Sequence, residues 1–235
     1  MKIITSWDDG HPLDLKVAEL LSKYGLKGTF FVPIKNIEGR PVISNIDLKK
    51  INRNFEVGSH TYDHSYLVGL SLKECFYQIT RGKEELEQIL GKEIEGFCYP
   101  GGKYDKHIKA AVIENRFIYA RSINNLRVDN NFDKFNIPTT LQFYPHKKRV
   151  IFRNFVLNGT EHIKKLKVLY TYLIAKDWLN AIFNIMDFCK EYNLNFHLWG
   201  HSWEVDEIGL WKELEKVLRH AASLKPESIY LRDSF

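Results

Sequence analysis

The chain has 235 residues, 44% of them hydrophobic and 27% charged, which are ordinary proportions for one globular domain. The net charge of +5 is mild and no long run of like charges occurs, so nothing indicates a nucleic-acid-binding arm. No apolar stretch is long enough to span a membrane, and the early acidic residues Asp8 and Asp9 exclude a signal-peptide pattern. We therefore expect a single cytoplasmic domain over residues 1–235 with no nucleic-acid partner.

Short apolar runs alternate with longer amphipathic segments, which is the pattern of βα units. The expected strands are residues 2–7, 28–33, 55–59, 95–100, 117–122, 195–199 and 228–231. The expected helices are residues 12–24, 47–51, 72–90, 105–115, 160–176, 177–192 and 207–224. Some seven βα units favour a distorted parallel β/α barrel, and a doubly wound sheet also fits.

Local signals set several of these boundaries. Ser71 with Glu74 three residues later predicts a capping box at the start of the long helix, and Gly91 predicts its end. Asp47 is the expected N-cap of the short helix. The polar segment 124–159 predicts loops with one or two strands.

Polar or glycine-rich clusters follow four of the expected strands. The carboxyl ends of parallel strands lie on one face of a sheet, so the clusters are expected to converge there. They are Asp8-Asp9-Gly10-His11, His60 to His64, Tyr99 to Gly102, and His201.

The first two clusters contain possible metal ligands. The spacing of His60 and His64 predicts two imidazoles one helical turn apart, able to hold one metal ion, although two unrelated histidines explain the spacing equally well. A zincin protease needs Glu after the first histidine, and Thr61 stands there instead. Of Asp8 and Asp9, one carboxylate suits the metal and the other suits a base beside it. A helix-capping turn explains only one of them.

The later clusters contain a possible acid and a possible oxyanion donor. Strand alternation places Trp199 and His201 on one face, where His201 is able to protonate a leaving amine. The backbone N–H of Gly101 is a possible oxyanion donor. A structural histidine and a plain turn are the alternatives. The aromatic residues Tyr99 and Trp199 are candidates for contact with a sugar substrate.

The first two clusters resemble the motifs of the polysaccharide deacetylase family, also called carbohydrate esterase family 4 or the NodB-homology domain. Ser6-Trp7-Asp8-Asp9-Gly10 is similar to its Thr-Phe-Asp-Asp-Gly motif, and His60-Thr61-Tyr62-Asp63-His64 matches His-(Ser/Thr)-x-x-His. The strand segment 28–32 is also typical of the family. The resemblance is strong over residues 3–105 and weak afterwards.

The resemblance implies a distorted β/α barrel that hydrolyses an N-acetyl group of a carbohydrate to an amine and acetate. It implies one divalent ion, with zinc favoured, and Asp8 as the general base that acts on a water molecule. The implied ligands are Asp9, His60 and His64. It further implies Gly101 as the oxyanion donor and His201 as the acid.

The chain departs from the family pattern at several positions. Cys98 replaces an Arg that pairs with the base, and Arg121, at the end of the next expected strand, is a candidate to supply the missing charge or to contact substrate. Gly101 replaces an aromatic residue, and Trp199 replaces Leu in the Leu-x-His motif. Near the first motif, His11 stands where Pro is usual.

A further departure concerns the Asp and Trp that brace the acid histidine in the family. Asp177-Trp178 matches them only in composition, because it is expected inside helical sequence. Cys98 is also a conceivable metal ligand, although a buried small residue is the simpler interpretation.

Three functions stay open on these residues. A carbohydrate N-deacetylase acting on a glycan precursor leads. The alternatives are a hydrolase of another non-peptide C–N bond, in a ureide or cyclic imide, and a non-catalytic carbohydrate-binding protein. The sequence leaves the sugar and the oligomeric state open.

Overall fold

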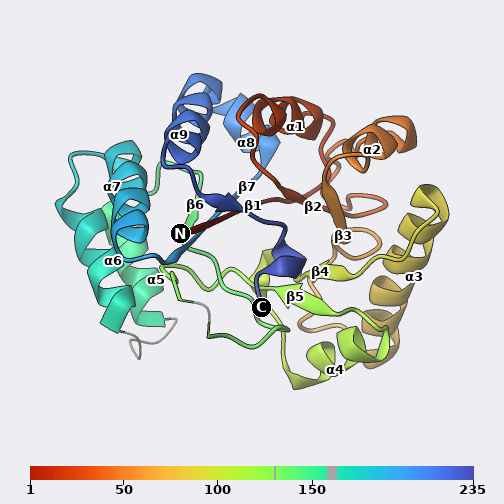
Figure 1. Ribbon diagram of the computed structural model, residues 1–235. Helices are drawn as coiled ribbons and strands as arrows, with labels where there is room; N and C mark the ends of the chain where they lie inside the picture. The colour runs from red at the N-terminus through yellow and green to blue at the C-terminus, as the bar shows by residue number, and fades with distance from the viewer. Residues whose placement is uncertain (130, 158–162) are drawn as a thin grey trace.

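The computed structural model describes residues 1–129, 131–157 and 163–235 (Figure 1). In these residues the strands form one sheet in the order β5-β4-β3-β2-β1-β7-β6, with β8 beside β1, and the pairings are parallel. The strands are β1 (Lys2–Trp7), β2 (Thr29–Val32), β3 (Glu56–Ser59), β4 (Gly96–Cys98), β5 (Tyr119–Arg121), β6 (Leu141–Gln142), β7 (Asn195–Gly200) and β8 (Glu227–Ser228).

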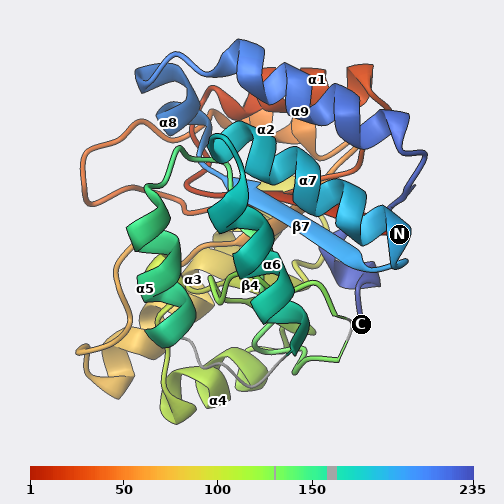
Figure 2. The same cartoon turned by 90° about the vertical axis from the view of Figure 1, so that its left-hand side faces the viewer.

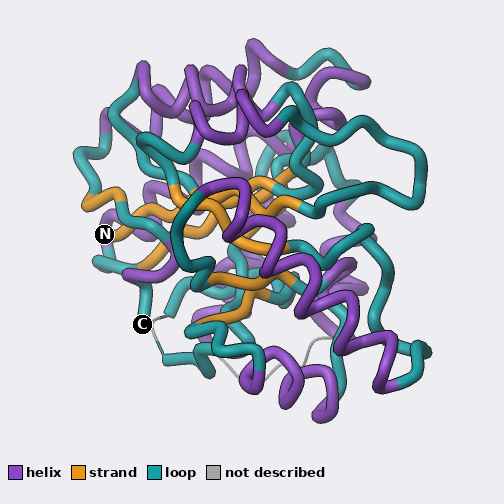
Figure 3. Tube along the Cα trace, turned by 90° about the vertical axis from the view of Figure 1, so that its right-hand side faces the viewer, coloured by secondary structure: helices purple, strands orange, loops and turns teal. Residues whose placement is uncertain are grey.

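The helices surround this curled sheet, whose strands run through the middle of the molecule (Figure 3). They are α1 (Asp14–Lys23), α2 (Asn45–Ile51), α3 (Leu72–Leu90), α4 (Lys106–Glu114), α5 (Lys148–Leu157), α6 (Ile163–Ile174), α7 (Trp178–Glu191), α8 (Ser202–Glu207) and α9 (Trp211–Ser223), with 3₁₀ turns η1 (Pro100–Gly102) and η2 (Leu231–Asp233). The edge strands β5 and β6 are not paired with each other in the described residues, so the barrel is incomplete there. The distorted β/α barrel is confirmed.

Local sequence signals set several helix ends as expected. Ser71 and Glu74 form the predicted capping box of α3, and Gly91 ends this helix with a φ of 67°. Asp47 is not the N-cap of α2, because Ser44 precedes the helix and accepts the N–H of Asp47 at 3.2 Å.

Two predictions about the second half of the chain need correction, and a third concerns residues that the structure does not describe. The segment 124–159 contains the unexpected helix α5. The expected helix 207–224 starts later, as α9 at Trp211, and an unexpected short helix, α8, ends at Glu207 before Gly209 with its φ of 68°. The predicted start of the next helix at residue 160 lies outside the described residues.

Side-chain alternation along the strands builds two cores. Along β1, Ile3 and Trp7 pack in the cluster between the sheet and the helices, whereas Ile4 packs in a smaller cluster with Phe31 and Tyr119 inside the barrel. Successive residues of a strand point to opposite faces, so every second residue enters the barrel. The inward positions at the carboxyl ends therefore decide which side chains meet there.

A buried carboxyl group lies inside the barrel on β3. Glu56 is 5% exposed, accepts a hydrogen bond from Thr29 Oγ1 at 2.6 Å, and lies 4.0 Å from Nε of Arg232 in η2. Burial raises the pKa of Glu56 above its ordinary value of 4.5, and the hydrogen bond and Arg232 offset only part of this shift.

Replacing Glu56 with Gln is expected to change how stability depends on pH. Between 4.5 and the raised pKa of Glu56, the unfolded carboxyl is ionised and the folded one protonated, so each pH unit lowers the wild-type free energy of unfolding by up to about 1.4 kcal/mol. Gln does not titrate. Urea unfolding at several pH values should therefore show that the free energy of unfolding of the variant rises relative to that of the wild type as pH rises through this window. A difference that stays constant with pH would contradict the assignment.

No helix among the described residues has the length and apolar character needed to cross a bilayer.

Candidate metal centre and catalytic site

The turn after β1 directs two adjacent carboxylates to different places. Asp8 continues the strand, donating its N–H to the carbonyl of Gly200 at 3.0 Å, whereas Asp9 and Gly10 adopt φ values of 75° and 56°. A Cβ on Gly10 would lie 2.6 Å from Cγ1 of Val32, so only glycine fits. This turn sends Asp8 into the barrel and Asp9 towards the histidines after β3.

His60 and His64 lie in a loop, so the expected spacing of one helical turn is wrong. Thr61 and His64 have φ values of 67° and 66°, which no α-helix contains. The loop nevertheless brings both rings to Asp9. Nε2 of His64 lies 3.0 Å from Oδ1 of Asp9, and Nε2 of His60 lies 3.6 Å from the same oxygen.

These three atoms fit one tetrahedral metal ion. Ligand atoms about 2.1 Å from zinc in tetrahedral directions are about 3.4 Å apart, close to the observed separations. Oδ1 of Asp9 is buried and has no hydrogen-bond donor with acceptable geometry. Burial raises the pKa of Asp9, but His64, His201 and His60 outweigh it and hold the net pKa below its ordinary range, so Asp9 is a carboxylate.

The protonation of His60, though not that of His64, suits a metal. Nδ1 of His60 lies 2.8 Å from the carbonyl oxygen of Cys98 and donates to it, which leaves a lone pair on Nε2. Burial lowers the pKa of His60 to about 4, so the ring is neutral. Burial also lowers the pKa of His64, but the nearby Asp9 carboxylate outweighs it and the net pKa is raised.

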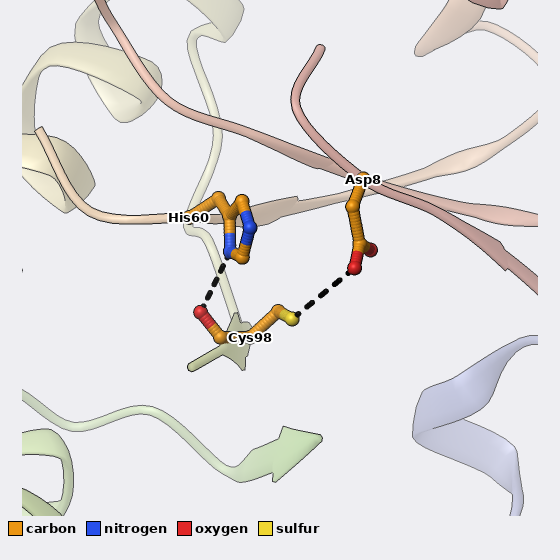
Figure 4. A group of neighbouring side chains, drawn as sticks. All are labelled: Asp8, His60 and Cys98. Atoms are coloured by element: carbon orange, nitrogen blue, oxygen red, sulfur yellow. Dashed lines mark hydrogen bonds between the residues drawn. The ribbon is translucent and has the colours of Figure 1, made fainter. Parts of the chain in front are cut away.

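A second group of possible ligands, Asp8, His60 and Cys98, lies beside the first (Figure 4). Burial raises the pKa of the Cys98 thiol well above its ordinary value despite nearby Arg121. A metal binds the thiolate and not the thiol, so this group suits a metal less well. The thiol instead donates weakly to Oδ2 of Asp8 at 3.8 Å.

Arg121 lies beside the position where the resemblance expects an arginine. Cys98 and Arg121 are direct neighbours across β4 and β5. The guanidinium forms an ion pair with Oδ2 of Asp8 and lies 2.8 Å from Sγ of Cys98. The expected contact of Arg121 with substrate is wrong, because the side chain is 0% exposed behind Asp8. The other oxygen of Asp8, Oδ1, is buried without a hydrogen bond.

His201 stands at the N-terminus of α8, braced by Glu204. Its Nδ1 lies 2.7 Å from Oε2 of Glu204, and its Nε2 lies 3.9 Å from Oδ2 of Asp9. Burial lowers the pKa of His201, but the hydrogen bond to Glu204 and the charges of Asp9, Glu204 and Asp8 together outweigh it, and the net pKa rises to about 9. The sequence reading missed Glu204, although its position three residues after His201 was a usable signal.

Asp177, which the resemblance compared with the bracing Asp of the family, has another role. It caps α7 by accepting the N–H of Asn180 at 2.8 Å.

Trp203 is a second residue that the sequence reading missed. Its indole N–H donates to Oδ2 of Asp9 at 2.8 Å, and its ring stacks on His201 with centroids 5.3 Å apart. Arg40 covers the ring at 3.3 Å from its centroid. Trp203 thus occupies one oxygen of Asp9 and leaves the other for the histidines.

Gly101 and Tyr99, which follow β4, have different surroundings. Gly101, in η1, has a φ of 60°, and a Cβ there would lie 2.3 Å from Cε1 of Tyr66. The half-exposed Tyr66 therefore fills the space beside Gly101. The expected contact of Tyr99 with substrate is wrong, because Tyr99 follows inward-facing Cys98 and so points outward. It is buried there, stacked on Tyr104 at 4.3 Å.

Trp199 and His11 are the two remaining candidates, and the structure places them in different surroundings. Trp199 is inward-facing and 8% exposed, with its ring 5.1 Å from the guanidinium carbon of Arg121 and 5.4 Å from the ring of His201. It therefore forms a wall between these two groups. His11 accepts the N–H of Leu13 on Nδ1 at 3.2 Å, which is a local capping contact before α1.

Comparisons with known proteins agree with this geometry. Residues 2–119 match the family model described as polysaccharide deacetylase. YlxY, an uncharacterised protein of Bacillus subtilis (strain 168), is 32% identical over 95 residues, which cover 40% of this chain and 28% of YlxY. The putative polysaccharide deacetylase YxkH of the same organism is 27% identical over 112 residues, covering 46% of this chain and 40% of YxkH. The chain thus spans less than half the length of these curated relatives.

A solved structure extends the likeness in fold to the whole chain. The chitin deacetylase of Colletotrichum lindemuthianum superposes with a TM-score of 0.64 at 15% identity, covering 100% of this chain and 87% of that one. The family model covers β1 through the start of β5 and includes Asp8, Asp9, His60 and His64. The chain belongs to the polysaccharide deacetylase family.

Proposed function

We propose that this chain is a metal-dependent hydrolase that removes an N-acetyl group from an amino sugar of a glycan or glycan precursor and releases acetate. One observation carries the proposal: the free, buried Oδ1 of Asp8 lies beside a cluster of Asp9, His60 and His64 whose ligand atoms converge. Binding a sugar needs no base next to a metal, whereas hydrolysis of an amide needs both. The related chitin deacetylase supports the same chemistry.

A divalent ion, with zinc favoured, would be held by Asp9, His60 and His64 and would supply a Lewis acid for the acetyl carbonyl group and for water. Asp8 takes up the proton of the attacking water on Oδ1, while Arg121 fixes the orientation of the carboxylate through Oδ2. The guanidinium thus performs the task of the family's arginine from β5.

The remaining steps are assigned to Gly101, which follows β4, and to His201, which follows β7. The N–H of Gly101 stabilises the negative charge that develops on the acetyl oxygen. His201 gives a proton to the departing amine. Its pKa of about 9 keeps the ring protonated at neutral pH, and Glu204 holds its orientation.

The Asp8→Asn variant is expected to lose activity while keeping its metal. The amide cannot accept the proton, so acetate release from N-acetylglucosamine oligomers should fall at least about a hundredfold. Zinc affinity, measured by calorimetric titration, should change little because Asp9 is intact. Asp63→Asn, which changes a carboxylate of the second motif that accepts a hydrogen bond from Ser65, is the matched control. A fully active Asp8→Asn enzyme would exclude Asp8 as the base, and a zinc-loaded wild type inactive on every N-acetyl sugar would favour a binding protein.

Removing the metal is expected to abolish turnover. Dialysis against a chelator should stop acetate release, and zinc should restore it. His60→Ala should weaken zinc binding at least about a hundredfold, since one of three protein ligands is lost. His107→Ala, at the start of α4, is the control histidine. A metal-free wild type that hydrolyses a ureide or cyclic imide would overturn the proposal in favour of the other C–N hydrolase.

The Arg121→Ala variant tests the arginine on β5. Without its ion pair Asp8 loses a fixed orientation, so kcat should fall about tenfold to a hundredfold with KM little changed. The variant should also unfold more easily, because it leaves a buried carboxylate unpaired. Arg127→Ala, which breaks the pair with Asp129, is the control for loss of an arginine ion pair. Unchanged kcat in Arg121→Ala would remove the assigned role.

A further inference from the structure

The helices α5 and α6 carry exposed apolar side chains on their outer side. Both helices lie far along the chain from the proposed metal ligands. They lie side by side at the edge of the molecule and face the viewer in Figure 2. We call their exposed large hydrophobic residues the α5–α6 face. These residues are Phe152, Val156, Leu157, Ile163, Leu166, Tyr170 and Ile174, and they are between 49% and 75% exposed.

The exposed residues of α6 form a continuous stripe. Ile163, Leu166, Tyr170 and Ile174 recur at intervals of three and four residues, which places them on one side of a helix. The opposite side carries buried residues such as Val168 and packs on the rest of the molecule. A surface helix normally has one apolar side, so the second stripe marks an interaction surface.

Positive charge surrounds this apolar face. The described residues 147–157 and 163–176 contain no Asp or Glu. Their exposed basic residues are Lys147, Lys148, Arg149, Arg153, Lys164, Lys167 and Lys176. Among the described residues, no carboxylate lies within salt-bridge distance of Arg149, Arg153 or Lys164. The face is therefore both apolar and strongly positive.

We propose that the α5–α6 face docks on the surface of a membrane that contains anionic lipid. An amphipathic surface with aliphatic and aromatic side chains framed by Lys and Arg suits the boundary between acyl chains and negative headgroups. A second copy of this chain fits poorly, because a two-fold contact would oppose Arg149, Arg153 and Lys164 with the same charges. Docking needs no substrate and stands apart from the proposed reaction.

A chain of hydrogen bonds joins the buried side of α6 to the proposed catalytic residues. Glu204, which braces His201, accepts from Nε2 of Gln142 at 2.9 Å. Oε1 of Gln142 lies 2.9 Å from Nε2 of His146, two residues before α5. The carbonyl of His146 accepts the hydroxyl of Tyr172 in α6 at 3.0 Å. A change in the position of α5 or α6 on docking would therefore reach Glu204 through these hydrogen bonds.

Sedimentation with lipid vesicles tests the proposal. The wild-type protein should pellet with vesicles of equal parts phosphatidylcholine and phosphatidylglycerol, less with pure phosphatidylcholine, and less as salt rises. The double variant Arg149→Glu with Arg153→Glu should bind the anionic vesicles about tenfold or more weakly. The double variant Leu166→Ser with Tyr170→Ser should lose binding to a similar extent by removing apolar contacts.

Control variants with matched substitutions elsewhere on the surface separate docking through α5 and α6 from general effects of charge and hydrophobicity. Lys49→Glu with Arg53→Glu reverses two exposed charges at the same spacing near α2, and Ile46→Ser with Tyr77→Ser removes two exposed apolar residues. Both controls should sediment like wild type, and all variants should share its thermal unfolding midpoint.

Three results would overturn the docking proposal. They are absence of wild-type binding to the anionic vesicles at any salt concentration, unchanged binding by both α5–α6 variants, and a wild-type dimer in light scattering that the Leu166→Ser, Tyr170→Ser variant dissociates. Acetate release is measured separately, so a failure of docking is distinguishable from a failure of the proposed reaction.

Discussion

The buried ion pair between Arg121 and Asp8 is the constraint around which the inside of the barrel is arranged. A fully buried guanidinium is costly unless it is paired and surrounded by suitable groups. Here it meets the carboxylate of Asp8 and lies over the faces of Phe31 and Trp199, at 5.3 and 5.1 Å from their ring centroids. Burial, followed by the charge of Arg121, lowers the pKa of nearby His197 to about 3, so this histidine stays neutral. One positive charge thus holds Asp8 in position and adds to the burial that keeps His197 neutral.

Several family features are supplied from neighbouring positions in space. Arg121 on β5 stands next to Cys98 on β4, where the family has its arginine. Glu204 braces His201 from the first turn of α8, and Tyr66 fills the space beside Gly101. In each case a different segment brings a similar group beside the position at which the resemblance expects it. A site defined by positions in space tolerates such exchanges, whereas a motif defined by spacing in sequence does not record them.

The accuracy of the sequence reading differed with the range of the interactions involved. The capping box of Ser71 and Glu74 is local, so its residues suffice to predict it. The loop conformation of Thr61 and His64, with φ above 60°, depends on contacts with other segments and was mistaken for a helical turn.

The error on Tyr99 was one of register. Cys98 faces inward beside Asp8, so its neighbour Tyr99 must face outward. The sequence alone did not fix which of the two residues enters the barrel.

The two oxygens of Asp9 show how an element outside the motifs completes the candidate metal centre. Oδ2 receives the indole N–H of Trp203, and Oδ1 faces His60 and His64. A free carboxylate rotates and offers either oxygen, whereas one held by a donor presents a fixed lone pair to a metal. Trp203 is itself fixed between His201 and Arg40. The start of α8 therefore orients both the proposed acid and a proposed metal ligand, which couples the two halves of the proposed reaction through one short helix.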